Sequence, residues 1–323
     1  MHLLLVVGGL LTLVIGCALG PAPAAASRTG VVVFSRGYAT GAPAQLWRIR
    51  ANGYGLRGLT APATADDLAP AVSPDGRVII FSRRFYDPTL GAYSDLFRVS
   101  VWGGRPRRIT HCLREPECGG RLRNQESSND PVFFAGYTAP AWSADGARLV
   151  TTLEIGDVYT VRGTLITMSP WGHARRVVGT GVEAAWSPWG RRLALLDRDT
   201  SHPECGYGSC LGLFVQRKNG TVRRQLTTLS VDVSNGISWS PNGRWIAYTD
   251  GYDLQLIRPQ GGTPRLLAND ALQAEWSPTG DALVYSSAGG GLFVVRSGGR
   301  VMHRLTSDPS DRDPAWAVVA ASR

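Results

Sequence analysis

Cysteine and histidine are the residues of this sequence whose type and spacing first suggest chemistry. Two cysteine pairs lie beside histidines: Cys112 and Cys118 follow His111, and Cys205 and Cys210 follow His202. Thiolate and imidazole groups bind zinc, but neither pair has the two-residue spacing of a zinc knuckle, and the pairs are far apart in the chain. We therefore predict two local disulfides, formed in an oxidising compartment, and no metal site.

Familiar catalytic motifs are absent from the sequence. It has no G-x-S-x-G nucleophile turn, no H-E-x-x-H metalloprotease motif and no phosphate-binding P-loop. Histidine, the commonest general acid–base residue, occurs only 5 times in 323 residues. We predict a protein that is not an enzyme and uses no cofactor.

A repeated five-residue stretch shows which elements would position any site. WSPNG at 239–243 returns as VSPDG at 72–76, WSADG at 142–146, WSPWG at 186–190 and WSPTG at 276–280. Serine, proline and a closing glycine are the residues that a tight turn requires, because proline presets φ and glycine accepts the left-handed region. The position of the aspartate varies between copies, so the motif is structural rather than catalytic.

Each turn belongs to a larger unit with four predicted strands. A short apolar run follows the turn, as in WIAYT at 245–249, and a second hairpin with Asn-Gly or Gly-Gly at its tip comes next, as in residues 254–268. Such units, repeated every ~40–50 residues, are typical of β-propeller blades. The strand around Trp316 has no partner after it, and GVVVFSRG at 30–37 has none before it. Pairing the two predicts an all-β, six-bladed propeller, closed by its C-terminal strand, as one domain over residues 28–323.

The repeat resembles that of the TolB-type β-propeller family. WSPNGRWIAYT at 239–249, followed by DLQLIRPQGGTPRLL at 253–267, matches the family pattern W-S-P-D-G, a strand, D-[IL]-[WFY] and a Gly-Gly hairpin. The resemblance extends over residues 30–318. It implies the fold strongly and the function weakly, because such blades serve in a periplasmic partner of an envelope lipoprotein, in noncatalytic domains of peptidases and in some lyases.

We predict a binding face on the side of the disc that carries the long loops, at 83–94, 111–137 and 197–210, opposite the tight turns. Aromatic and arginine side chains are the usual anchors of such surfaces, although Phe85 and Tyr86 could instead pack the loops onto the blades. The candidates are Arg83, Arg84, Phe85, Tyr86, Tyr93, Arg121, Arg123 and Tyr207. Three aspartates, Asp67, Asp311 and Asp313, are placed at the channel mouth, where they would hold a cation or cap connections.

The N-terminal 27 residues predict export. An apolar run at 3–16 precedes small residues, and Cys17 lies where a lipoprotein signal would place its lipidated cysteine. Cleavage near 24–26 and an uncleaved membrane anchor are the alternatives. The net charge of +9 favours attraction to anionic envelope polymers or lipids, while export argues against a nucleic-acid partner.

These observations predict a secreted, periplasmic or lipid-anchored propeller that acts as a binding scaffold in the cell envelope. Its partner would be an envelope protein or glycan, it would touch the membrane only through its N-terminus, and it would be a monomer. The alternative is a propeller lyase or hydrolase that acts on an extracellular polysaccharide or peptide, with its reactive residues in the channel mouth.

Overall fold

The computed structural model describes residues 30–37, 42–62, 64–120, 122, 134–156, 161–199, 210–229 and 236–318. Within them the chain forms β-strands together with a 3-10 turn at Cys112–Arg114 and a π turn at Pro116–Gly120. The prediction of an all-β fold is confirmed. Among these residues there is no helix whose length and apolar character would allow it to cross a membrane.

Four of the sheets contain four strands each, and neighbouring strands in each sheet are antiparallel. The first has the order β24 (Arg312–Ala317), β1 (Val31–Arg36), β2 (Gln45–Arg50) and β3 (Arg57–Gly58). The others are β12 (Glu183–Trp186), β13 (Arg192–Arg198), β14 (Leu211–Arg217) and β15 (Arg224–Thr228); β16 (Ile237–Trp239), β17 (Ile246–Asp250), β18 (Asp253–Ile257) and β19 (Arg265–Ala268); and β20 (Ala271–Trp276), β21 (Ala282–Ser287), β22 (Leu292–Arg296) and β23 (Val301–Arg304).

The remaining strands form one eight-stranded sheet made of two four-stranded parts. The parts are β4 (Ala65–Val72), β5 (Val78–Asp87), β6 (Gly91–Ser100) and β7 (Arg107–Arg108); and β8 (Phe134–Trp142), β9 (Leu149–Gly156), β10 (Val161–Met168) and β11 (Arg176–Thr180). A short parallel pairing of β6 with β8, in which Ser94 lies opposite Gly136, joins them. A β-carbon on Gly136 would overlap the Ser94 backbone nitrogen, so glycine permits this close approach.

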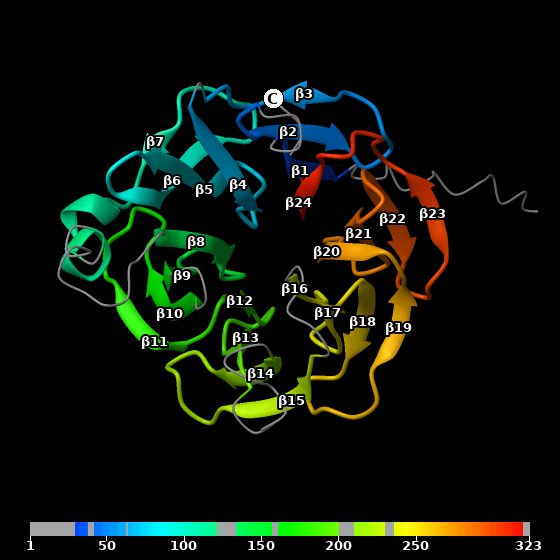
Figure 1. Cartoon of the computed structure of the whole chain (residues 1–323). Helices are drawn as coiled ribbons and strands as arrows, with labels where there is room; N and C mark the ends of the chain where they lie inside the picture. The colour runs from blue at the N-terminus through cyan, green and yellow to red at the C-terminus, as the bar shows by residue number, and fades with distance from the viewer. Residues whose placement is uncertain are drawn as a thin grey trace, which may run out of the picture.

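The four-stranded units stand around a central axis (Figure 1). The strands β4, β8, β12, β16, β20 and β24 lie innermost, and β3, β7, β11, β15, β19 and β23 lie on the circumference. Apolar side chains fill the space between neighbouring units: Leu46 of β2, for example, packs with Phe97 of β6 in one buried cluster. The core is therefore divided among the interfaces between units, and the innermost strands are left facing the axis.

The five predicted tight turns have the expected geometry. In each, the amide of the closing glycine donates to the carbonyl of the serine three residues earlier, as Gly243 does to Ser240 at 2.8 Å. Every closing glycine has positive φ, including Gly190, which follows the variant Trp189 at 62°. Because the glycine geometry persists where the aspartate is missing, the repeat is a turn motif, as predicted.

The prediction of an irregular loop at 83–94 is wrong. Most of these residues continue β5 and β6, whose register runs out to Asp87 opposite Gly91. The cross-strand pair Phe85 and Tyr93 stacks at 5.0 Å between ring centroids, and aromatic pairs of this kind stabilise antiparallel strands. Residues 83–94 thus form the end of an extended antiparallel hairpin instead of a loop.

Candidate functional site

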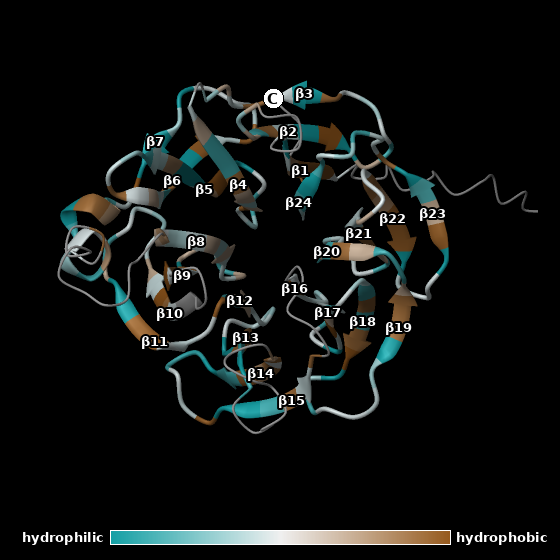
Figure 2. Cartoon of the chain, in the orientation of Figure 1, coloured by the Kyte–Doolittle hydropathy of each residue, from teal (hydrophilic) through white to brown (hydrophobic). Residues whose placement is uncertain are grey.

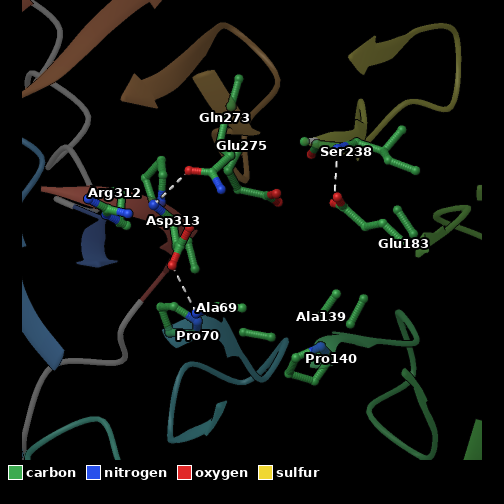
Figure 3. A pocket seen from close by; sticks show the side chains of 18 of the residues that line it. Ala69, Pro70, Ala139, Pro140, Glu183, Ser238, Gln273, Glu275, Arg312 and Asp313 are labelled. Carbon is green, nitrogen blue, oxygen red and sulfur yellow. Dashed lines mark hydrogen bonds between the residues drawn. The ribbon is translucent and has the colours of Figure 1, made fainter. Parts of the chain in front are cut away.

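A cavity of about 790 Å³ lies on the axis of the ring and is lined by all the innermost strands. Its charged lining residues are Glu154, Glu183, Glu275, Asp311, Asp313, Arg84 and Arg312. Figure 3 shows Glu183 and Glu275 extending into this space, with Pro70 and Pro140 on strands across from Glu275. A concave site with a few convergent polar groups is the usual form of a ligand site.

Three neighbouring innermost strands share an unusual backbone, and we call this side of the cavity the proline half. In β24, β4 and β8 a residue with positive φ precedes proline: Asp313 at 51°, Ala69 at 48° and Ala139 at 44°. Non-glycine residues rarely adopt this region, and proline ordinarily keeps the preceding residue extended. The Ala69 amide donates to Asp313 Oδ2 at 3.1 Å, so one strand supports the backbone of the next.

The other three innermost strands are β12, β16 and β20, and we call this side the glutamate half because Glu183 of β12 and Glu275 of β20, both partly buried, line the cavity there. Glu183 of β12 accepts a hydrogen bond from the Ile237 amide of β16 at 3.1 Å. Gln273 of β20 accepts one from the Asp313 amide of β24 at 3.1 Å, which links the two halves (Figure 3). Side chains of this half therefore bond to the backbone of the next strand along the ring.

Burial favours the protonated forms of three carboxyl groups that line the cavity, Glu183, Glu275 and Glu154. It raises the pKa of Glu183 to about 7, and the nearby Asp313 and Glu154 charges add to the rise. It raises the pKa of Glu275 to about 8, assisted by the charge of Glu183. Burial also raises the pKa of Glu154, which the neighbouring Thr138 and Arg84 oppose. Strongly shifted carboxyl groups in a cleft mark candidate functional sites.

The three predicted channel-mouth aspartates occupy different environments. Asp67 is fully buried and forms a bidentate ion pair with Arg83, with N–O distances of 2.6 and 2.8 Å. Asp311 forms a bidentate ion pair with Arg36, with N–O distances of 2.5 and 2.8 Å. Burial raises the pKa of Asp67, and the Arg83 pair opposes the rise. Asp311 and Asp313 line the cavity, and Asp313 supports the backbone there. Asp67 and Asp311 therefore tie strands together with paired charges.

The binding-face candidates are also divided. Arg83 is held by Asp67, and Phe85 and Tyr93 stack on each other within the extended hairpin. Arg84 lines the axial cavity, where its guanidinium lies 5.0 Å from the Phe134 ring centroid. The Tyr86 hydroxyl donates to Asp66 Oδ2 at 2.7 Å while its side chain stays exposed. Arg121, Arg123, Tyr207 and Cys17 lie outside the described residues.

Sequence reasoning did not single out Glu183 and Glu275, although a signal was available. Glu183 precedes Trp186 by three residues and Glu275 precedes Trp276 by one. Side chains alternate between faces along a strand, so odd offsets place both carboxyls on the face opposite the repeated tryptophan. A charged residue at that position of an innermost strand points to the axis.

The cysteine predictions can be followed in part. Cys112 and Cys118 form a disulfide, as predicted, within the helical turns beside β6. Cys210 is also disulfide-bonded, and its predicted partner Cys205 lies outside the described residues. In the part of the chain that the structure describes, no three histidine, cysteine, aspartate or glutamate side chains gather closely enough to hold a metal ion.

Comparisons with known proteins show the fold. No protein-family model matches the chain. It is 25% identical over 161 residues to the uncharacterized protein YidR of Escherichia coli K12, a match covering 49% of this chain and 36% of YidR, so it spans about a third of that relative.

Solved structures resemble nearly the whole chain at low identity. A chain of a nidogen–laminin complex matches with a TM-score of 0.64 and 12% identity, over 89% of this chain and 98% of that one. A putative TolB from Agrobacterium tumefaciens matches with a TM-score of 0.55 and 16% identity, over 86% and 88%. A puromycin hydrolase matches with a TM-score of 0.52 and 16% identity, over 85% and 45%. The chain thus has a β-propeller fold, which is found in enzymes and in proteins without catalytic activity.

Proposed function

We propose that this protein is an extracytoplasmic, noncatalytic propeller of the TolB-like type that acts as a binding scaffold in the cell envelope. In this proposal its six four-stranded units form six blades, and the pairing of β24 with β1 closes the ring. The Cys112–Cys118 disulfide supports an oxidising compartment, and the likeness to the putative TolB supports the type of propeller.

The observation that carries the binding role is the composition of the axial cavity. Its lining has five acidic residues against two arginines, and Glu183 and Glu275 hold carboxyl groups that titrate near neutral pH. A cationic group placed between them would favour their charged forms and would find a low-dielectric surrounding in which attraction is strong. The occupant we propose is a segment of an envelope protein, or a small ligand, that carries an amine or guanidinium group.

Calorimetry with short lysine-containing peptides and matched glutamine peptides tests this proposal. Saturable binding should require the cationic residue, and it should strengthen as pH rises toward 8, because bound cation displaces protons from Glu183 and Glu275. The double variant Glu183→Gln/Glu275→Gln should lose this dependence. Equal binding of both peptides at every pH would contradict an axial cation site.

The alternative is a propeller enzyme that acts on a polysaccharide or peptide. Carboxyl groups that titrate near neutrality suit general acid–base catalysis, and this is the observation that favours it. Mass spectrometry of the same peptide mixtures separates a scaffold from an enzyme that acts on peptides. Intact peptides after saturating incubation are expected for a scaffold, whereas cleavage that Glu275→Gln abolishes would establish the enzyme.

A further inference from the structure

Two pairs of arginines face each other directly on the outer hairpins of neighbouring units. Arg48 of β2 lies opposite Arg57 of β3, and Arg98 of β6 lies opposite Arg107 of β7. Like charges in directly opposed cross-strand positions destabilise a sheet. Among the described residues no carboxylate forms an ion pair with any of the four, whereas the adjacent Arg108 pairs with Asp95 at 2.7 Å.

The other units avoid this opposition. At the equivalent pairs the outer arginines Arg176, Arg224 and Arg265 face Thr167, Val215 and Leu256. Two of these outer arginines also donate to the next unit's hairpin tip, Arg224 to the Gln260 carbonyl at 2.9 Å and Arg265 to the Ser297 carbonyl at 2.5 Å. In these three units an uncharged residue lies opposite the outer arginine, whereas in the units of β2 and β6 a second arginine lies there.

Each arginine pair comes with an exposed tryptophan from the next hairpin. The Arg48 guanidinium lies 4.4 Å from the ring centroid of Trp102, and that of Arg98 lies 3.7 Å from the ring centroid of Trp171. These tryptophans are 44% and 58% exposed, so one ring face stacks on arginine and much of the ring remains open to solvent. A stack between units needs one arginine only, and within the described part of the chain the second arginine of each pair, Arg57 or Arg107, forms no side-chain hydrogen bond or ion pair.

The unpaired charge is partly shielded from water. Arg48 Nε and Arg98 Nη1 are buried and have no hydrogen-bond partner in the described structure. Burial lowers the pKa of both arginines, and the charges of Arg57 and Arg50 add to the effect on Arg48, as Arg107 does on Arg98. An anion brought to either pair would offset the two like charges and relieve the repulsion.

The two sites lie in tandem on the edge of the disc. The hairpin of β6 and β7 supplies Trp102 to the first site and the arginine pair of the second. Figure 2 shows β3 and β7 as hydrophilic strands on the circumference of neighbouring units.

We propose that these arginine–tryptophan sites, Arg48/Arg57/Trp102 and Arg98/Arg107/Trp171, bind an acidic polysaccharide. Guanidinium groups match carboxylates with two parallel hydrogen bonds, and a flat indole ring packs against the apolar face of a sugar. Two successive sites of the same composition suit a chain in which an anionic sugar repeats. This surface is separate from the axial cavity and does not depend on the function proposed there.

Affinity electrophoresis in gels containing alginate, a carboxylate polysaccharide, or neutral dextran tests the proposal. The unmodified protein should be retarded by alginate and not by dextran, with weaker retardation at high salt. The variant Arg57→Gln/Arg107→Gln should weaken alginate binding about tenfold. Its melting temperature should not fall, because the change removes repulsion between opposed charges.

Two controls separate recognition at these two sites from attraction by the overall positive charge of the protein. Arg244→Gln/Arg300→Gln removes the same charge from two exposed arginines on other units, and it should leave alginate binding unchanged. Trp171→Ala keeps the charge and should weaken binding several-fold. Equal weakening by the control double variant would overturn the proposal. So would equally tight binding to DNA or to phosphatidylglycerol vesicles that Trp171→Ala does not affect.

Discussion

The two halves of the axial cavity differ in what they place on the axis: one has unusual backbone conformations and the other has carboxyl side chains with raised pKa values. In the proline half the backbone departs from regular strand geometry, at Ala69, Ala139 and Asp313. In the glutamate half Glu183 and Glu275 place carboxyl groups in the cavity. Their surroundings raise the pKa of both groups, whereas the backbone strain is found in the other half. Strain and perturbed carboxyls both concentrate at functional sites. Both features line one cavity, and this supports the binding role that we propose for the axis.

The repeated tryptophans differ between the halves as well, and they give the largest expected effect. Trp239 of the glutamate half is 8% exposed, while Trp142 of the proline half is half-buried and donates to the Ala71 carbonyl at 3.1 Å. Trp239→Ala should lower the free energy of unfolding by about 3–5 kcal/mol, and Trp142→Ala by less, because the smaller buried area leaves a smaller cavity. Denaturant unfolding measures both. Equal losses of stability would show that the strands of the proline half pack as tightly as those of the glutamate half.

The backbone of the proline half can be tested at Ala139, whose side chain faces the cavity. Ala139→Val should lower the free energy of unfolding by about 2–3 kcal/mol, because a β-branched residue is strongly disfavoured at positive φ. Ala139→Gly should change it by less than about 1 kcal/mol. Ala185→Val, at a cavity-lining strand position of the glutamate half, is the matched control and should be tolerated. If the two valine variants lose the same stability, packing rather than backbone strain distinguishes Ala139.

Repeat spacing and turn residues were sufficient to predict the all-β fold and the tight turns, because glycine and proline indicate backbone geometry directly. The spacing of Cys112 and Cys118 was sufficient to predict the first disulfide. Repeat spacing and turn residues were insufficient for the proline half, since proline after Ala69 and Ala139 predicts extended backbone there and the structure shows positive φ. Placing Glu183 and Glu275 requires knowing which face of each strand meets the axis. The opposed arginines depend on the residue-by-residue register of the outer hairpins, and Gly-rich tips such as Gly103-Gly104 mark where a turn lies without showing which residues pair.

Protonation in the glutamate half predicts a specific dependence of stability on pH. Glu275 keeps its proton in the folded chain up to about pH 8 and loses it near pH 4.3 when unfolded, so folding is favoured at low pH and stability falls as pH rises between these values. Glu275→Gln should remove this loss and gain about 1–2 kcal/mol at pH 8 relative to the unmodified protein, with little difference at pH 4. Urea unfolding at several pH values measures it. If the free energies of unfolding of the two proteins change with pH in the same way, Glu275 is ionised in the folded state and the prediction is wrong.

The smallest change in stability is expected for a substitution at Asp313, which links the two halves electrostatically. Asp313 belongs to the proline half, yet its charge contributes to the raised pKa of Glu183 in the other half. Asparagine tolerates positive φ and can still accept from the Ala69 amide, so Asp313→Asn should change the free energy of unfolding by less than about 0.5 kcal/mol. It should nevertheless lower the pKa of Glu183, because a neighbouring like charge is removed. Carbon-13 NMR titration of the glutamate carboxyls detects that shift. An unchanged Glu183 titration, with folding intact, would mean that the strained strands and the buried carboxyls share a cavity without sharing their electrostatics.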